Sequence, residues 1–434
     1  MSPFKQIKQF SLLSFMIAVI TGILYRYGML YPIPDSLHLS DIRHAHSHLM
    51  LFNWVCPLIM LFMAEQLIAL SDGEPTDHDR LVRQFRNCLY SILFLGLLSY
   101  PFFFFFGYRP VPIGTFNLPL AAIISGLIML NWYWFSWIYY KNRKGKLSLS
   151  YSTDHSGVLL SYLTERSGVK HRSRHESEFK PTLSLTFFDA SLVALLISSL
   201  GAWGVSIFQF TSADSALISS ALTHFFLALF TEGWAILGIL GILWSRADLH
   251  SIPIHSGWLW IPILFGSMLI FPFSLTQSLL SPVMVWTAKT GTFLIAGSLL
   301  LNLFYLNKAG LFKGFIWKSI GLFLCVKIIF QLIAITPVEF WPGDHGLRVL
   351  YLHLVLLGLV STILFTSFKN HFTELPIILF VLSVWFIILS LMMISGYWPL
   401  QLQPANLYYW VLSAAILPLF PAFWIWVHHY KTEV

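Results

Sequence analysis

Stretches of about 20 consecutive apolar residues recur from one end of this sequence to the other, and they constrain its fold more than any other feature. A helix of about 20 residues rises about 30 Å, which is the thickness of the hydrocarbon core of a bilayer. Of the 434 residues, 57% are hydrophobic and 10% are charged, which is too few charges to cover a water-soluble surface. The sequence therefore predicts an all-α, polytopic membrane protein whose first partner is the lipid bilayer.

The apolar runs predict about twelve transmembrane helices. Their approximate ranges are 10–31, 45–70, 87–107, 114–140, 184–209, 216–245, 257–276, 282–306, 310–335, 347–368, 374–395 and 405–429. No composition change marks a separate soluble domain, so residues 1–434 are expected to form a single transmembrane domain.

Lysine and arginine fall mainly in alternate connections between these helices. The longest of these connections is a basic loop at about 141–183, whereas the connections at 31–41 and 336–346 are poor in both residues. By the positive-inside rule, both termini and the basic loop should be cytoplasmic, in a bacterial cytoplasmic membrane. The net charge of +7 then follows from topology, and no nucleic-acid partner is expected.

Three histidines, His44, His46 and His48, stand at the start of the second predicted helix. At 100° per residue, His44 and His48 share one face of the helix and His46 points to the other. An interfacial polar cluster is one interpretation of this group, and a metal or haem site is the other.

Two further helices carry ionisable residues at membrane depth, with His224 and Glu232 on the sixth and His353 on the tenth. Such a residue costs a few kcal/mol unless it meets a partner, so it is a functional candidate, although a packing hydrogen bond remains an alternative. The second, sixth and tenth helices run in the same direction, so His46, His224 and His353 could share one layer near the outer side. Two neutral imidazoles from facing helices suit the axial positions of a haem iron.

These motifs resemble the catalytic subunit of the haem-copper oxidases, a superfamily that includes the large subunit of nitric-oxide reductase. Arg43-x-x-His46, with Pro57 eleven positions later, is similar to the start of the family's second helix, and Asp344 precedes His353 by the family's nine positions. The resemblance implies a ring of twelve helices with a low-spin haem b between His46 and His353, with His48 as the second choice of ligand. Arg43 or Ser47 is expected to fix the His46 ring.

The sequence also departs from the family. Tyr351 stands where the family has the histidine of the high-spin haem, and the seventh predicted helix lacks the two adjacent histidines that bind copper or iron. On the sixth helix, the reductase pattern has its glutamate four positions after the histidine, whereas Glu232 follows His224 by eight. The binuclear centre is therefore incomplete.

Three functions follow as hypotheses. The first is a membrane haem protein for electron transfer or small-ligand sensing, which takes electrons from a quinol or cytochrome c and has possible partner subunits. The second is an oxygen or nitric-oxide reductase with His224, Glu232 and Tyr351 around a second haem, copper or non-haem iron. The third is a carrier or a metal- or haem-handling assembly factor, in which Lys289, Lys327, Asp189 and Glu232 line a path.

Overall fold

The computed structural model of the protein describes residues 4–70, 75–164, 179–210, 216–247, 255–275, 279–336, 345–366, 368 and 374–431. Within these residues, eleven helices are long and apolar enough to cross a membrane, and the stretch Ser256–Leu269 forms a shorter apolar segment between the sixth and the eighth spans. The chain is thus an all-α, polytopic membrane protein, as the apolar runs predict. We number the spans in chain order and count the shorter segment as the seventh.

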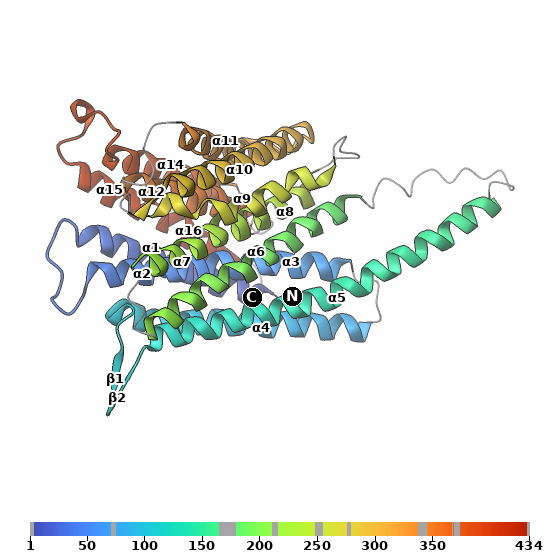
Figure 1. Cartoon of the computed structure of the whole chain (residues 1–434), viewed down its shortest axis with the longest axis horizontal. Coiled ribbons are helices and arrows are strands. Elements are labelled where there is room, and N and C mark those ends of the chain that lie inside the picture. Colours follow the sequence, from blue (N-terminus) through green and yellow to red (C-terminus); the bar gives the residue numbers. More distant parts are fainter. Residues whose placement is uncertain are drawn as a thin grey trace.

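Figure 1 labels the helices of the first six spans and colours them from blue at the N-terminus to yellow-green. They are α1 (Lys5–Tyr27); α2 (Leu39–His48), η1 (Leu49–Val55) and α3 (Cys56–Ala69); α4 (Pro75–Phe106); α5 (Leu120–Thr164); α6 (Phe179–Phe210); and α7 (Ala216–Ala228), η3 (Leu229–Ala235) and α8 (Ile236–Arg246).

The remaining six spans complete the chain. They are η4 (Ser256–Leu259), α9 (Ile261–Leu269) and η5 (Phe271–Ser274); α10 (Pro282–Lys308); α11 (Phe315–Ile335); α12 (His345–Leu352), η7 (His353–Ser361) and α13 (Thr362–Phe365); α14 (Leu375–Ile394); and α15 (Leu407–Ile416) and α16 (Leu419–Lys431), which follow a short 3₁₀ turn, η9 (Leu400–Leu402).

The observed helices differ from the predicted ranges at several ends; α4, for example, begins at Pro75 rather than at about 87. A small antiparallel hairpin of β1 (Val111–Ile113) and β2 (Phe116–Leu118) precedes α5, so the fourth span begins later than predicted. The basic segment after it is a loop only in part, because α5 continues as a helix to Thr164 and extends beyond the other helices in Figure 1. Apolar periodicity marks where a helix is buried, and it carries no information on how far the helix continues outside.

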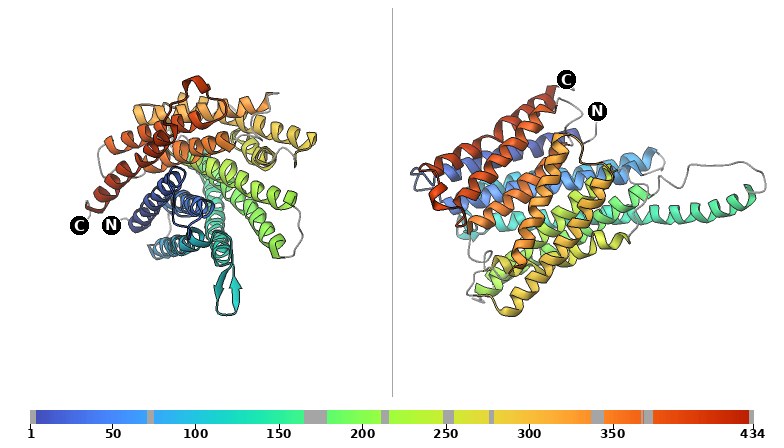
Figure 2. Two further views of the ribbon diagram at one scale, coloured as in Figure 1. Left: turned by 90° about the vertical axis from the view of Figure 1, so that its left-hand side faces the viewer. Right: turned by 90° about the horizontal axis from the view of Figure 1, so that it is seen from above.

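The spans form a closed ring in sequence order. Each span contacts the next one along the chain, and α1 contacts both α15 and α16, so the last span packs against the first. The left view of Figure 2 shows this order, since the chain colours follow one another around the bundle and the two termini lie side by side.

Three spans lie at the centre of this ring and are more enclosed by protein than the others. The buried shares of the second, sixth and tenth spans are 83%, 89% and 61%, whereas no other span exceeds 50%. Each of the three contains a π-helical segment, η1, η3 or η7, respectively. With the short segment counted as the seventh, these three spans are four apart along the chain.

A π-helical turn inserts an extra residue into the hydrogen-bond ladder and is frequent at functional sites. For η1 a local cause is visible, because Pro57 has no N–H to donate and its ring clashes with the carbonyl four residues earlier. In η3 and η7 the widened turn contains a glycine instead. A Cβ on Gly233 would lie 2.8 Å from the Cβ of Ala194, and one on Gly358 would lie 3.1 Å from the ring of Phe323.

Candidate functional site

The histidines at the start of the second span point in two directions, as the helical period predicts. The rings of His44 and His48 both face Tyr108, which follows α4, with centroids 5.1 and 6.1 Å away. His48 also stacks on Phe103 at 3.7 Å, and its Nε2 lies 3.1 Å from the Tyr108 hydroxyl. Burial raises the pKa of Tyr108 to about 12, so its hydroxyl stays protonated and donates to His48.

His46 points the other way, toward α1. Its Nδ1 lies 2.7 Å from the carbonyl oxygen of Ala18, so this nitrogen carries the proton and donates, which leaves Nε2 with a free lone pair. Gly22, one turn further along α1, faces the flat side of the ring. A Cβ at Gly22 would lie 3.0 Å from Cε1 of His46 and 3.1 Å from Nδ1, so only a glycine leaves the ring its full space.

His353 has the same arrangement within its own span. Its Nδ1 lies 2.7 Å from the carbonyl oxygen of Val349, one helical turn earlier, and Nε2 is again the nitrogen that remains available. Both His46 and His353 lie deep among the helices, yet each ring is only half-buried. Part of each histidine therefore remains accessible.

The two imidazoles lie at the same depth on parallel helices. Each follows the first residue of its span by seven positions, a rise of about 10 Å, and the two rings interact electrostatically. Eight positions further along both spans, the indole N–H of Trp54 donates to the Ser361 hydroxyl at 2.9 Å. Because the two contacts follow the same order along both spans, the second and the tenth spans run parallel and side by side.

Arg26, in the last turn of α1, lies close to this histidine pair. Its charge acts on both His46 and His353. Within the described residues it has no carboxylate partner, since its guanidinium contacts only the Met29 sulfur, at 3.6 Å, and the ring of Tyr25, at 5.5 Å. The histidine pair is thus accompanied by one positive charge that no protein carboxylate neutralises.

The sequence proposed other neighbours for His46, and the structure corrects this point. Arg43 is exposed, and the Ser47 hydroxyl donates to the Arg43 carbonyl oxygen at 2.9 Å rather than to the His46 ring. The ring is held by a backbone carbonyl of another span, which no side-chain pattern reveals. His48, the second choice of ligand, has its Nε2 bonded to Tyr108, and its buried Nδ1 has no hydrogen-bond partner among the described residues. Asp344 lies outside the described residues.

A second polar cluster lies near the middle of the bundle and joins the sixth, ninth and tenth spans. The Lys327 ammonium contacts Oε2 of Glu232 at 2.6 Å and the Tyr351 hydroxyl at 2.7 Å. The Tyr351 hydroxyl donates to Oε1 of Glu232 at 2.6 Å, and the Gln331 amide N–H group lies 3.3 Å from Oε2. Glu232 and Lys327 are 3% and 0% exposed, so this is an ion pair removed from solvent.

The cluster brings together Glu232 and Tyr351, two of the three residues predicted for catalysis, and leaves out His224. Like His46 and His353, His224 follows the first residue of its span by seven positions, and Glu232 lies eight positions further along the same span. His224 interacts electrostatically with Arg348, whose Nη1 donates to the Ser274 carbonyl at 2.9 Å. Within the described residues, His224 makes no hydrogen bond to Glu232 or Tyr351.

The partner of Glu232 is Lys327, which the sequence analysis placed with Glu232, Lys289 and Asp189 along a carrier path. Lys289, on α10, lies 5.6 Å from the ring of Trp286. Asp189, on α6, pairs with Arg143, with 3.6 Å between Oδ2 and Nε.

A metal site of three or more His, Cys, Asp or Glu side chains does not occur among the described residues. His255, the described histidine nearest the seventh span, caps the turn there, since its Nδ1 accepts from the Gly257 N–H at 3.2 Å. Haem at the histidine pair, like copper or non-haem iron at Glu232 and Tyr351, stays a prediction.

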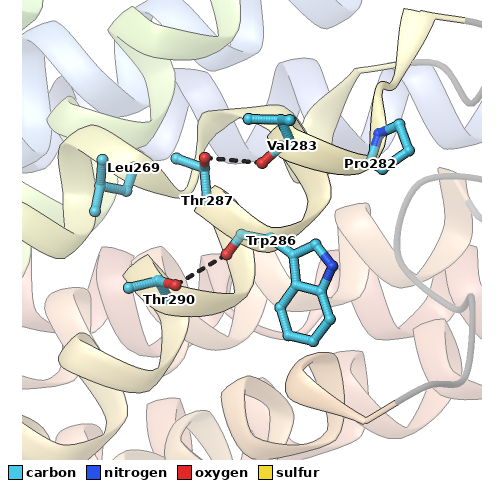
Figure 3. A pocket seen from close by; sticks show the side chains of 6 residues that line it. All are labelled: Leu269, Pro282, Val283, Trp286, Thr287 and Thr290. Carbon is cyan, nitrogen blue, oxygen red and sulfur yellow. Dashed lines mark hydrogen bonds between the residues drawn. The ribbon is translucent and has the colours of Figure 1, made fainter.

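Figure 3 shows a cavity of about 440 Å³ on the bundle surface between α9 and α10. Its lining includes Val283 and Trp286, which are 74% and 70% exposed, and Thr287 and Thr290. Both threonine hydroxyls donate to carbonyls of their own helix, at 2.8 and 3.0 Å. None of the predicted site residues lines this groove.

Comparison with known proteins identifies no relative: no protein-family model matches this sequence, and no curated protein matches it.

Proposed function

We propose that this protein holds one low-spin haem b between His46 and His353 and uses it to transfer electrons or to sense a small ligand. One observation carries the proposal: two imidazoles at one level of parallel, adjacent spans, each with Nδ1 bonded to a backbone carbonyl and Nε2 available. Haem supplies reversible one-electron chemistry and a site for diatomic ligands.

The surrounding residues support this assignment. A hydrogen bond from Nδ1–H to a carbonyl fixes the tautomer of a ligating histidine and raises its basicity. Ala18 and Val349 provide that carbonyl for His46 and His353, respectively. Arg26 supplies a positive charge of the kind that pairs with a carboxylate, and haem carries two propionate carboxylates.

The ring of spans, with the second, sixth and tenth at its centre, is the arrangement that the resemblance to the haem-copper oxidase catalytic subunit implies. We extend the proposal to twelve crossings, with the seventh formed by the short segment Ser256–Leu269. Both termini are then cytoplasmic in a bacterial inner membrane, and the histidine layer lies near the outer surface.

The test is a reduced-minus-oxidised absorption spectrum of detergent-purified protein, with pyridine haemochrome analysis of the same sample. We expect sharp low-spin b-type bands at about one haem per chain. His46→Ala and His353→Ala should each abolish these bands, whereas His48→Ala and the exposed His38→Ala should retain them. Unchanged spectra in both ligand variants would refute the assignment.

A second candidate function rests on a different observation, the ion pair of Glu232 and Lys327 inside the bundle. Buried ionisable pairs in transmembrane segments mark ion and proton pathways, so a carrier or assembly factor fits this cluster. Metal-dependent uptake into vesicles by a haem-free protein would favour this function, and Glu232→Gln should then abolish the uptake.

The reductase hypothesis requires turnover at Glu232 and Tyr351. In the cluster both oxygens of Glu232 and the hydroxyl of Tyr351 are already engaged with protein groups. Consumption of oxygen or nitric oxide by purified protein with a chemical reductant would support the hypothesis, and the absence of both activities would eliminate it.

A further inference from the structure

A cavity of about 430 Å³ lies at the end of the bundle opposite the histidine pair, where the sixth, eighth, ninth, tenth and eleventh spans meet. Its lining includes Arg246 at the end of α8, Lys313 and Gly314 in the turn before α11, and Thr366 after α13. Neither the histidine pair nor the Glu232 cluster contributes a residue to it.

Two contacts show on which face of the bundle this cavity opens. Arg246 lies over the ring of Phe62, at 5.8 Å, and Phe62 is one turn from Glu65. Glu65 pairs with Lys8, near the start of α1, at 3.2 Å. The cavity therefore opens on the face of the bundle that carries the N-terminus, which the basic loops predict to be cytoplasmic.

Arg246 is held in place by its neighbours, and the Glu65 carboxylate interacts with it electrostatically. Its guanidinium stacks near the rings of Phe62 and Trp317, at 5.8 and 5.5 Å, and its Nη1 donates to the Thr366 hydroxyl at 2.5 Å. A guanidinium has five N–H donors, and within the described residues this is the one hydrogen bond that Arg246 makes. Its remaining donors are available, and the aromatic rings fix the plane of the group before any ligand arrives.

Two further groups add positive potential to the same cavity. Lys313 folds back over Gly310, since a Cβ there would lie 3.1 Å from both Cε and Nζ of the lysine, and it has no carboxylate partner within the described residues. The 21-residue helix α11 begins at Phe315 in the cavity wall, and no side chain caps its first N–H groups, because Gly314 is the N-cap. Glu374 contributes the one carboxylate of the lining.

We propose that this cavity binds a phosphate group through Arg246, Lys313 and the N-terminal N–H groups of α11, and that the group belongs to an anionic phospholipid of the adjoining leaflet. Guanidinium and ammonium groups beside a helix N-terminus match phosphate oxygens, and basic pockets between transmembrane helices are recognised sites for anionic headgroups. The exposed ring of Phe315, 45% accessible at the cavity edge, provides an apolar surface for the acyl chains.

The experiment is native mass spectrometry of the full chain in detergent, titrated with phosphatidylglycerol, with phosphatidylcholine as the uncharged headgroup control. We expect retained phosphatidylglycerol on the wild type, about fivefold weaker binding in Lys313→Gln, and about tenfold or weaker binding in Arg246→Gln. Lys318→Gln is the matched control, because Lys318, on α11, is exposed like Lys313 but is not part of the lining. This variant should bind phosphatidylglycerol as the wild type does.

Competition identifies the source of the phosphate. Millimolar inorganic phosphate is added to the wild type and to Lys313→Gln. If it displaces lipid from the wild type but leaves the residual lipid on Lys313→Gln unchanged, the cavity recognises phosphate as such. If phosphate has no effect while phosphatidylglycerol is retained, the glycerol backbone and acyl chains contribute and the lipid is the ligand. Equal lipid retention in Lys313→Gln, Lys318→Gln and the wild type would overturn the proposal, even if Arg246→Gln fails to fold. Haem content plays no part in this measurement.

Discussion

The histidine pair and the Glu232 cluster are both polar sites inside the same bundle, but they differ in how many of their polar atoms bond to other protein groups. In the cluster, the Lys327 ammonium, the Tyr351 hydroxyl and both carboxylate oxygens of Glu232 bond to one another. In the pair, each imidazole donates from Nδ1 to a carbonyl, and Nε2 makes no hydrogen bond within the described residues.

On the proposed function, this difference separates a site that stabilises the fold from a site that binds haem. Burying a polar group costs free energy unless it is hydrogen-bonded, so the cluster must form when the chain folds. An accessible imidazole nitrogen at the edge of a space carries a smaller cost and offers a lone pair to a metal. Substitutions in the Glu232 cluster should therefore mainly lower the free energy of unfolding, whereas substitutions in the histidine pair should mainly weaken ligand binding.

The largest effect is expected for Lys327→Met. It leaves the Glu232 carboxylate buried without its counter-ion, which should lower the free energy of unfolding by about 3–5 kcal/mol. The measurement is equilibrium unfolding in mixed detergent micelles. Lys289→Met makes the same chemical change at a half-buried lysine near Trp286 and should cost less than about 1 kcal/mol.

A double variant tests the cause. In Glu232→Gln with Lys327→Met the buried charges disappear together, and the new amide can donate to the Gln331 Oε1 atom, which has no partner in the wild type. Most of the lost stability should return. If the double variant is as unstable as Lys327→Met alone, the unpaired charge is not the reason for the loss.

The next largest effect is expected at the histidine pair, and it requires bound haem. Haem added to haem-free protein at about 100 times its dissociation constant should raise the free energy of unfolding by about 2.7 kcal/mol. His46→Ala and His353→Ala should remove this increase while changing the stability of the haem-free protein by about 1 kcal/mol, the worth of one hydrogen bond. A haem-dependent increase that survives in both variants would place the ligand elsewhere.

The contrast also separates what could be predicted from sequence from what could not. Span positions follow from hydropathy alone, and the split between His46 and the His44 and His48 face follows from 100° per residue, so both were predictable. The contact of Lys327 with Glu232 joins residues 95 positions apart, and no local pattern reports which helices meet.

The backbone features of the site could not be predicted from the sequence for a related reason. The partner of His46 is the carbonyl of Ala18, and every residue has a carbonyl, so no residue type marks it. The three π segments follow only partly from local sequence, since Pro57 accounts for η1 but the widened turns at Gly233 and Gly358 depend on neighbours in other spans.

Gly22→Ala should sharpen the contrast with a smaller effect. The new methyl group would meet Cε1 of His46 at 3.0 Å, so the ring must shift while its bond to Ala18 holds it, which we expect to weaken haem binding by about 1 kcal/mol or roughly fivefold. Gly297→Ala is the control, because a Cβ there meets nothing within 4 Å. Equal haem affinity in both variants, measured by absorbance titration, would show that Gly22 does not shape the ligand site.

The smallest effect is expected for Ser361→Ala, which removes the acceptor of the Trp54 indole N–H and with it a side-chain bond between the second and tenth spans. Hydrogen bonds between membrane helices contribute about 0.6 kcal/mol on average, so the loss on unfolding should be about this size and should vanish in a Trp54→Phe background. Haem content should stay at the wild-type level, because each imidazole is oriented by its own carbonyl rather than by this bond. If Ser361→Ala loses haem as completely as His353→Ala, the spacing of the two rings depends on the register that Trp54 and Ser361 set, and the histidine pair would then be a property of the helix interface and not of two independently oriented ligands.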